Sequence, residues 1–283
     1  MNLDTEYERI VDFIQNVNRL LKSDGVVVGI SGGIDSAICA KLSVDALGKD
    51  KCIGIAMPSD DSDPKDLEDA KMLTSILDIR LEIFPVSLLL DIFSIPRWNF
   101  EKEVKPFMLE PTKLLPSQMQ LLYTMKLRGR AYILSYFAGI NNYLQCQTLQ
   151  KTEWLLGWLD KFGDAAGDFA PIFHLYKTQV RELAKYIDLP DFILNRAPTS
   201  GNFPMTDEEC IGMTIEEADR ILFYLEKQLS MVDISKLTGI NQDKIVRISE
   251  VVKVGKLFTM IPITIDSTLE SKPIHQEARS KIC

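Results

Sequence analysis

Residues 26–42 constrain the fold more than any other part of the chain. A β-branched run at 26–30 predicts a buried strand, and the two glycines that follow it, Gly32 and Gly33, permit positive φ and a close approach of the backbone to a ligand. An amphipathic helix then begins near Asp35. Because a helix N-terminus carries unpaired N–H groups and partial positive charge, this strand, turn and helix predict a phosphate-binding site.

Several interpretations of this loop compete. A Walker A loop is excluded, because the loop has no lysine and no G-x-x-x-x-G-K-[ST] pattern. Residues 29–33 match the G-x-S-x-G nucleophile elbow, which would make Ser31 the nucleophile of a serine hydrolase with His174 or His275 as its base. A tight turn without a ligand is the plainest alternative. Residues 31–36 match the S-G-G-x-D-S pyrophosphate loop at every position.

The pyrophosphate loop gives the first family resemblance. The chain resembles the N-type ATP pyrophosphatases, which cleave ATP to AMP and pyrophosphate while they adenylate a substrate. The resemblance implies that ATP is bound by a loop set that comprises Gly29, Ile30, Ser31, Gly32, Gly33, Ile34, Asp35 and Ser36.

Composition limits the class of protein. A chain of 283 residues can form one large α/β domain or two small ones. Its 32 Lys+Arg against 40 Asp+Glu give a net charge of −8, which argues against a nucleic-acid partner. The five cysteines form no C-x-x-C pair, so reduced thiols and a cytoplasmic location are expected. No apolar stretch approaches the ~20 residues of a membrane span, and no basic leader precedes an apolar run.

Periodicity along the chain predicts alternating strands and helices. This alternation predicts an α/β fold, a doubly wound parallel sheet flanked by helices and Rossmann-like, with ligands at the carboxyl ends of the strands. We expect one domain over 1–264, a mobile tail over 265–283 and a proline-rich surface excursion over 95–116. Strands are expected at 26–30, 52–57, 80–84 and 143–148, with a further strand-like run at 170–173, and helices at 5–22, 64–77 and 118–138.

Two groups of charged residues, the cations at 126–130 and the acidic run at 60–63, can be explained without a ligand. On the helix over 118–138, Lys126 and Arg130 are four residues apart and share a face, whereas Arg128 points elsewhere. The acidic run at 60–63 lacks the spacing of a calcium loop, so we expect Asp63 to cap the following helix.

A second block sharpens the resemblance. Residues 148–153, 159–171 and 175–184 are similar to the matching run of ammonia-dependent NAD synthetases, and the likeness extends from about 10 to 225. The chain departs from that family at Thr124, at Leu149-Gln150 and at Gly255-Lys256, where the family usually has asparagine, glycine with a short polar residue, and His-Lys.

The resemblance implies a role for each matched residue. Asp35 and Glu153 would bind Mg²⁺, which needs only one or two protein carboxylates, and Lys177 would neutralise charge on the phosphates. Catalysis would fall to Asp35, Lys177 and Asp168. The remaining implied contacts are Thr148 and Thr199 on the nucleotide, and Arg128, Lys161 and Asp168 on the deamido-NAD side, with Lys256 as a further cofactor-binding residue.

The reaction that the resemblance implies is the amidation of a carboxylate. Deamido-NAD would attack the α-phosphorus of ATP, and ammonia would then displace AMP from the acyl-adenylate. The resemblance further implies a homodimer, and a separate glutaminase could supply the ammonia. An adenylating ligase for a different carboxylate, a nucleotide-binding relative without activity and the serine hydrolase remain alternatives.

Overall fold

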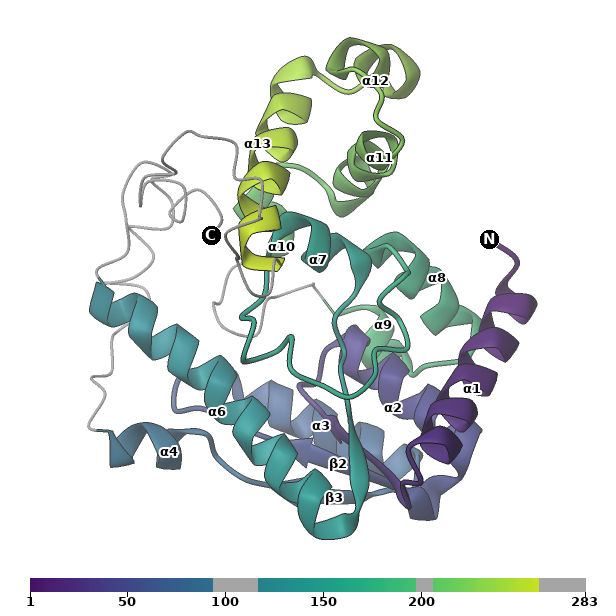
Figure 1. Cartoon of the computed structure of the whole chain (residues 1–283), viewed down its shortest axis with the longest axis vertical. Helices are drawn as coiled ribbons and strands as arrows, with labels where there is room; N and C mark the ends of the chain where they lie inside the picture. Colours follow the sequence, from purple (N-terminus) through teal and green to yellow (C-terminus); the bar gives the residue numbers. More distant parts are fainter. Residues whose placement is uncertain (94–116, 197–205, 260–283) are drawn as a thin grey trace.

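The fold is built on a parallel sheet of four strands in the order β3-β2-β1-β4 (Figure 1). This computed structural model describes residues 1–93, 117–196 and 206–259. The predicted doubly wound α/β fold is confirmed, and the four strands are β1 (Gly25–Gly29), β2 (Cys52–Ala56), β3 (Arg80–Ile83) and β4 (Tyr143–Cys146).

The strand order places the ligand-binding edge. The chain passes from β1 to β2 and then β3 in one direction, and later returns to add β4 on the opposite side of β1. The direction of winding therefore reverses between β1 and β4, and in open α/β sheets ligands bind outside the carboxyl ends of the strands at such a point. The loops that follow β1 and β4 lie at this position.

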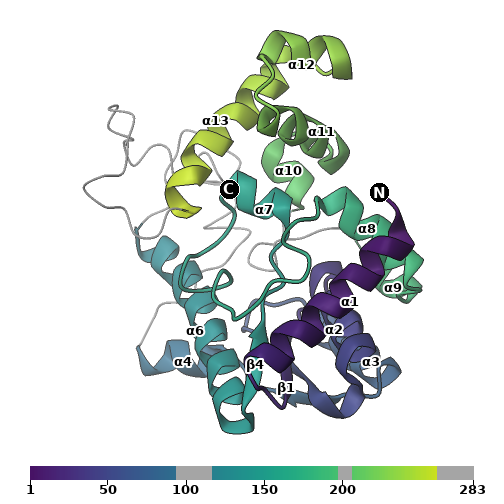
Figure 2. The same cartoon turned by 45° about the vertical axis from the view of Figure 1, so that its right-hand side comes forward.

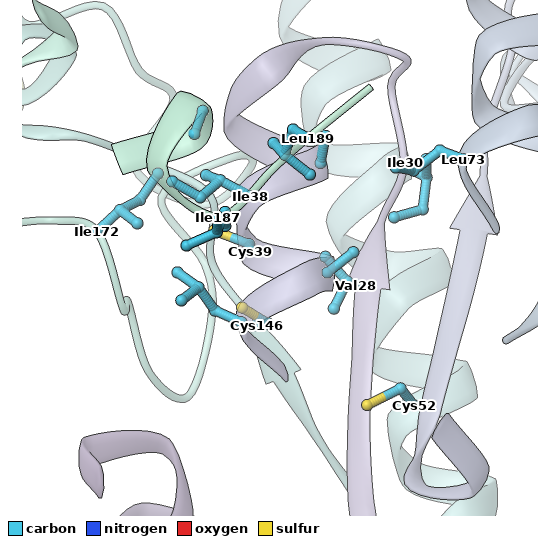
Figure 3. Packing of buried hydrophobic residues seen from close by; sticks show 14 of the residues in the cluster. Val28, Ile30, Ile38, Cys39, Cys52, Leu73, Cys146, Ile172, Ile187 and Leu189 are labelled. Carbon is cyan, nitrogen blue, oxygen red and sulfur yellow. The ribbon is translucent and has the colours of Figure 1, made fainter. Parts of the chain in front are cut away.

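Helices cover both faces of the sheet (Figure 2). Residues of β1 alternate between two cores, as expected for a strand buried on both sides: Val26 and Val28 pack with one cluster and Val27 with the other. Figure 3 shows Val28 in the first of these clusters, near Ile30 and Leu73. One face carries α1 (Leu3–Leu20), α2 (Ile34–Leu47), α3 (Pro64–Ile76) and α8 (Lys177–Tyr186), and the other carries α4 (Ser87–Ile92) and α6 (Ser117–Asn141).

A helical module, α10–α13, stands apart from the sheet (Figure 1). It has its own apolar core, which includes Ile221, Ile234 and Ile248 and reaches α7 through Leu156. Its elements are α10 (Asp207–Ile211), α11 (Ile215–Glu226), α12 (Met231–Thr238) and α13 (Gln242–Thr259), and the remaining short elements are η1 (Lys49–Lys51), α7 (Lys151–Leu156) and α9 (Asp191–Leu194).

The prediction of a strand-like run at 170–173 is wrong, because these residues form a turn. Phe169 makes a single parallel bridge to Cys146, and the chain then turns, with Leu175 N donating to Ile172 O at 3.0 Å. Pro171 has no N–H to donate, so the ladder cannot continue past it.

Other expectations are confirmed or cannot be compared with the structure. Asp63 caps α3, and the predicted burial of Cys39, Cys52 and Cys146 is confirmed. The excursion over 95–116 and the tail over 265–283 lie outside the described residues. Across the described ranges, no helix combines the length and apolar character needed to cross a membrane.

Candidate active site

The loop after β1 is held by its own hydroxyls. Ser36 Oγ accepts a hydrogen bond from Ser31 N at 3.2 Å and donates one to Gly33 O at 2.9 Å, while the Ser31 and Ser36 hydroxyls lie 3.1 Å apart. Gly32 has a φ of +78°, and a Cβ there would lie 2.7 Å from Asp66 O. Only glycine fits this position without displacing the first turn of α3.

A cavity of about 250 Å³ opens where β1 and β4 end. The predicted nucleotide loop lines it through Ser31, Gly33 and Asp35, and the segment after β4 contributes Thr148 and Leu149. Glu153 of α7 and Lys177 of α8 also line it. Residues that are far apart in the chain therefore meet at the reversal point of the sheet.

Three of the predicted residues form one charge cluster. Lys177, only 4% exposed, donates from Nζ to Asp35 Oδ2, and Glu153 Oε2 accepts from Gln150 N at 3.2 Å. Burial opposes the charge on Lys177, but Asp35 and Glu153 outweigh that effect and raise its pKa. Burial, reinforced by the charge of Asp35, also raises the pKa of Glu153 well above its usual range.

The same cluster suits a divalent cation. Asp35 Oδ1 is buried, and no group in the described part of the chain forms a hydrogen bond with it. Within those residues no three His, Cys, Asp or Glu side chains are grouped as a metal site, so a cation here would rely on two carboxylates. Two carboxylates are enough for a cation such as Mg²⁺, which takes one or two of them and completes its shell with water and phosphate oxygens.

Arginines supply further positive charge. Arg196 donates from Nη1 to Asp69 Oδ2 at 2.6 Å and to Gly32 O at 3.4 Å, and it also binds Asp66. It therefore ties the phosphate loop to α3. Arg130 and Arg181 line the cavity as well, and burial lowers the pKa of Arg130.

Sequence reasoning gave none of these three arginines a role in the site. One signal was available for Arg196, which directly precedes the matched segment 197–200. The partners of Arg196 lie more than 100 residues away in the chain, so the pairing itself had no local pattern.

The predicted division of the cations on α6 is confirmed. Lys126 is 2% exposed and binds Asp61 at 2.7 Å, and Arg130 lines the cavity. Arg128 instead points to the outside and forms two hydrogen bonds with Asp160, at 3.0 and 3.1 Å.

The residues expected on the deamido-NAD side lie outside the cavity wall. Lys161 and Arg128 both lie over the Phe162 ring, at 5.8 and 5.4 Å from its centroid. Asp168 Oδ2 accepts from Gln145 N at 2.7 Å and so extends the pairing of β4. Thr199 lies outside the described residues, as does the side chain of Lys256 on α13.

The departure at Leu149-Gln150 has a structural explanation. Gln150 is the N-cap of α7, and its side chain accepts from Thr152 N at 2.6 Å while Glu153 bonds back to Gln150 N. Leu149 is 4% exposed in the cavity wall and is not among the described residues with positive φ. The backbone at this position therefore accepts a leucine.

The hydrolase interpretation finds no support in this geometry. Ser31 is bonded to Ser36, whereas His174 Nε2 lies 2.6 Å from Glu6 Oε1, on α1. His275 lies outside the described residues. The alternative that uses Ser31 as a nucleophile is not favoured.

Comparison with known proteins shows the family of the chain. The sequence model of the NAD synthase family matches residues 6–257. An NH(3)-dependent NAD(+) synthetase of Methanococcus aeolicus is 35% identical over 240 residues, which cover 83% of this chain and 88% of that protein. The protein of the same name from Methanocaldococcus jannaschii is 36% identical over 261 residues, or 90% of this chain and 94% of that one.

Solved structures show the same fold. An NH3-dependent NAD synthetase from Campylobacter jejuni, in complex with nitrate, superposes with a TM-score of 0.72 at 27% identity, over 94% of this chain and all of that one. An NMN synthetase from Francisella tularensis gives a TM-score of 0.73 at 25% identity, over 94% of this chain and 100% of that one.

Proposed function

Because the chain belongs to the NAD synthase family, we propose that it converts deamido-NAD to NAD with ammonia, at the expense of ATP. It is a carbon–nitrogen ligase that releases AMP and pyrophosphate through an acyl-adenylate. The observation that carries this proposal is the meeting of the pyrophosphate loop, Asp35 and Lys177 in one cavity.

The residues around the cavity suit adenylation rather than hydrolysis. The nicotinate carboxylate is a poor electrophile, so it is activated by attack on the α-phosphorus of ATP, which expels pyrophosphate. Backbone N–H groups of the loop and the hydroxyls of Ser31 and Ser36 would hold the phosphates, and the Lys177 ammonium would neutralise the charge that develops as the α–β bond breaks. Ammonia then attacks the carbonyl carbon, and AMP leaves.

Magnesium and its ligands belong to the same proposal. Asp35 and Glu153 would hold Mg²⁺ between them, which is supported by the buried Asp35 Oδ1, an atom without a hydrogen-bond partner among the described residues. When bound, Mg²⁺ would offset phosphate charge and orient the triphosphate. Arg128, Lys161 and Asp168 are proposed to contact deamido-NAD, and Thr148, Thr199 and Lys256 are proposed to complete the nucleotide and substrate contacts.

The test of the function is a product assay with purified protein. ATP, Mg²⁺, ammonia and deamido-NAD together should yield AMP, pyrophosphate and NAD, and omission of any one should stop product formation. Formation of ADP would contradict the adenylation. A parallel assay with nicotinate mononucleotide tests a different carboxylate, and ester hydrolysis that is lost in Ser31→Ala but ignores ATP would establish the hydrolase instead.

We propose that the protein is a homodimer in which a second copy covers the outer side of α6. Tyr132, Tyr136 and Ile140 are 69%, 56% and 61% exposed there and recur every four residues, which forms an apolar stripe along the helix. Sedimentation should give the mass of a dimer, and Tyr136→Glu should shift it toward that of a monomer. A monomeric wild type would overturn this part of the proposal.

Location and nitrogen supply complete the proposal. A cytoplasmic location is supported by the four cysteines of the described residues, which are free thiols. Free ammonia or a separate glutaminase would provide the nitrogen. Cell fractionation, and activity with ammonium salts against activity with glutamine, would test the two points.

A further inference from the structure

One carboxylate of the helical module reaches the two helices that carry Glu153 and Lys177 of the charge cluster. Asp219 of α11 is 5% exposed, and both of its oxygens are used. Oδ1 accepts from Thr152 Oγ1 at 2.5 Å, and Oδ2 accepts from Thr178 N at 2.8 Å. Thr152 lies on α7 and Thr178 on α8, so this single side chain joins three helices.

Thr152 extends the connection to Lys177. Its Oγ1 accepts from Lys177 N at 3.0 Å while its hydroxyl proton is donated to Asp219. The first N–H groups of a helix have no partner within the helix, and here the first two of α8, on Lys177 and Thr178, are bonded to Thr152 and Asp219. The start of α8 is therefore defined by residues of α7 and α11.

The residues that form these hydrogen bonds are neighbours in the chain of Lys177 and Glu153. Lys177 begins α8 and presents its ammonium to Asp35, and Glu153 directly follows Thr152 in the first turn of α7. A shift of either helix start would move one of these side chains against the other. Displacements of about 1 Å in a catalytic arrangement can cost about 100-fold in rate.

We propose that Asp219 is a positioning residue, which fixes Lys177 and Glu153 relative to each other through Thr152 and the start of α8. The proposal rests on the proposed function, because it assumes that Lys177 and Glu153 serve adenylation. It makes the helical module part of the active site, although its helices stand apart from the sheet that carries the phosphate loop (Figure 1).

The alternative is that Asp219 only fastens α11 to α7. Burial by itself raises the pKa of the Asp219 carboxyl, and the hydrogen bonds from Thr152 and Thr178 oppose that effect. A buried carboxylate is costly to keep unless its oxygens are bonded. An apolar contact would fasten the two helices without this cost, whereas two directed hydrogen bonds also fix where α8 begins.

The experiment compares variants that change these hydrogen bonds with little change in volume. Asp219→Asn loses one acceptor, and Thr152→Val loses the hydroxyl. Both should lower kcat about 10- to 100-fold, with a smaller change in the KM for ATP, since the loss affects the arrangement in the transition state. Thr152→Ser should recover most of the rate that Thr152→Val loses.

The matched control is Asp233→Asn. Asp233 is an exposed carboxylate in the same module, where it bonds locally to Ser230 at 2.6 Å, so its removal should leave kcat unchanged. Circular dichroism and thermal unfolding show which variants are folded at the assay temperature. If Asp219→Asn destabilises the fold too far, the Thr152 pair provides the same comparison.

Two results separate failure of this inference from failure of the function. If folded Asp219→Asn and Thr152→Val keep the wild-type kcat while Lys177→Met loses activity, the positioning role is wrong and the function stands. Hydrogen exchange needs no activity: the amides of Lys177 and Thr178 should exchange faster in Asp219→Asn, and unchanged exchange would overturn the inference even if the wild type makes no AMP.

Discussion

At the scale of single residues, Asp35 and Glu153 have the clearest expected roles. The neutral isosteres Asp35→Asn and Glu153→Gln keep their shape but lose the charge that would hold Mg²⁺. Each should lower the rate of pyrophosphate release about 10²- to 10³-fold, the scale of removing one electrostatic element from a preorganised site, and should raise the Mg²⁺ concentration needed for half-maximal rate.

The control for this prediction lies on the same helix as Asp35. Asp45 pairs with Lys41 at 2.5 Å, away from the phosphate loop, so Asp45→Asn should leave both the rate and the Mg²⁺ response close to wild type. Normal magnesium dependence in both active-site variants would show that the cation is bound elsewhere.

The sequence was informative about residues whose patterns are local. The S-G-G-x-D-S loop and the Lys126–Arg130 face could be predicted, because both depend on spacing within one element. The bonds of Arg196 to Asp69 and of Asp219 to Thr178 could not, since they join segments that come together only in the folded chain. Leu149, which stands where the family usually has glycine, lies buried in the cavity wall and is not among the described residues with positive φ.

At the scale of elements, α13 crosses α7 at a pair of glycines. A Cβ on Gly157, which has a φ of +72°, would lie 2.3 Å from Gly255 Cα. A Cβ on Gly255 would lie 2.7 Å from Gly157 N and 2.8 Å from Leu156 C. All of these are backbone atoms, so the crossing requires glycine both at the C-cap of α7 and within α13, which explains the departure at Gly255.

Gly255→Ala should therefore destabilise the helical module by about 1–3 kcal/mol, because the two backbones must separate. Chemical denaturation followed by circular dichroism measures this change. Gly139→Ala on α6 is the control: among the described residues, no atom beyond its own stretch of helix lies within 4 Å of the place that the added methyl group would take. That variant should be neutral or stabilising by up to about 1 kcal/mol. Equal stabilities for the two variants would contradict the close crossing.

The positions of helices and strands were predictable where they depend on the residues of the element itself. The two central strands, β1 and β2, are apolar runs, and α3 begins at Pro64 after its N-cap Asp63. The run at 170–173 is apolar as well, but it contains Pro171, and the adjacent strand β4 ends at Cys146. Only the single bridge between Phe169 and Cys146 is formed. Periodicity alone could not reveal that missing partner.

At the scale of the whole molecule, the sheet and the helical module have separate cores, and α7 connects the module to the cavity. The sheet supplies the phosphate loop, while α7 contributes Leu156 to the core of the module and Glu153 to the site. The parallel sheet could be anticipated from βα alternation, but the attachment of the module could not, because it depends on Asp219 and on the glycine crossing. We expect the two parts to act as one unit when nucleotide binds.

This arrangement predicts a reciprocal linkage between nucleotide binding and the stability of the module. If opening of the module disturbs the starts of α7 and α8, ATP with Mg²⁺ at about 100 times its Kd should stabilise the closed module by about 2.7 kcal/mol. Hydrogen exchange of amides in α11–α13 should slow accordingly, although these helices lie away from the phosphate loop.

The linkage also predicts that a module weakened in its own core binds ATP less tightly. Ile234 is fully buried in α12, and Ile234→Ala should cost the module about 2–5 kcal/mol of stability. The apparent affinity for ATP then falls in proportion to the fraction of molecules whose module remains closed. Val232→Ala, on the same helix but 48% exposed, should change neither quantity. Nucleotide that protects α2 and α8 but leaves exchange in α11–α13 unchanged would show that the module opens independently of the site, because a linkage of this kind must act in both directions.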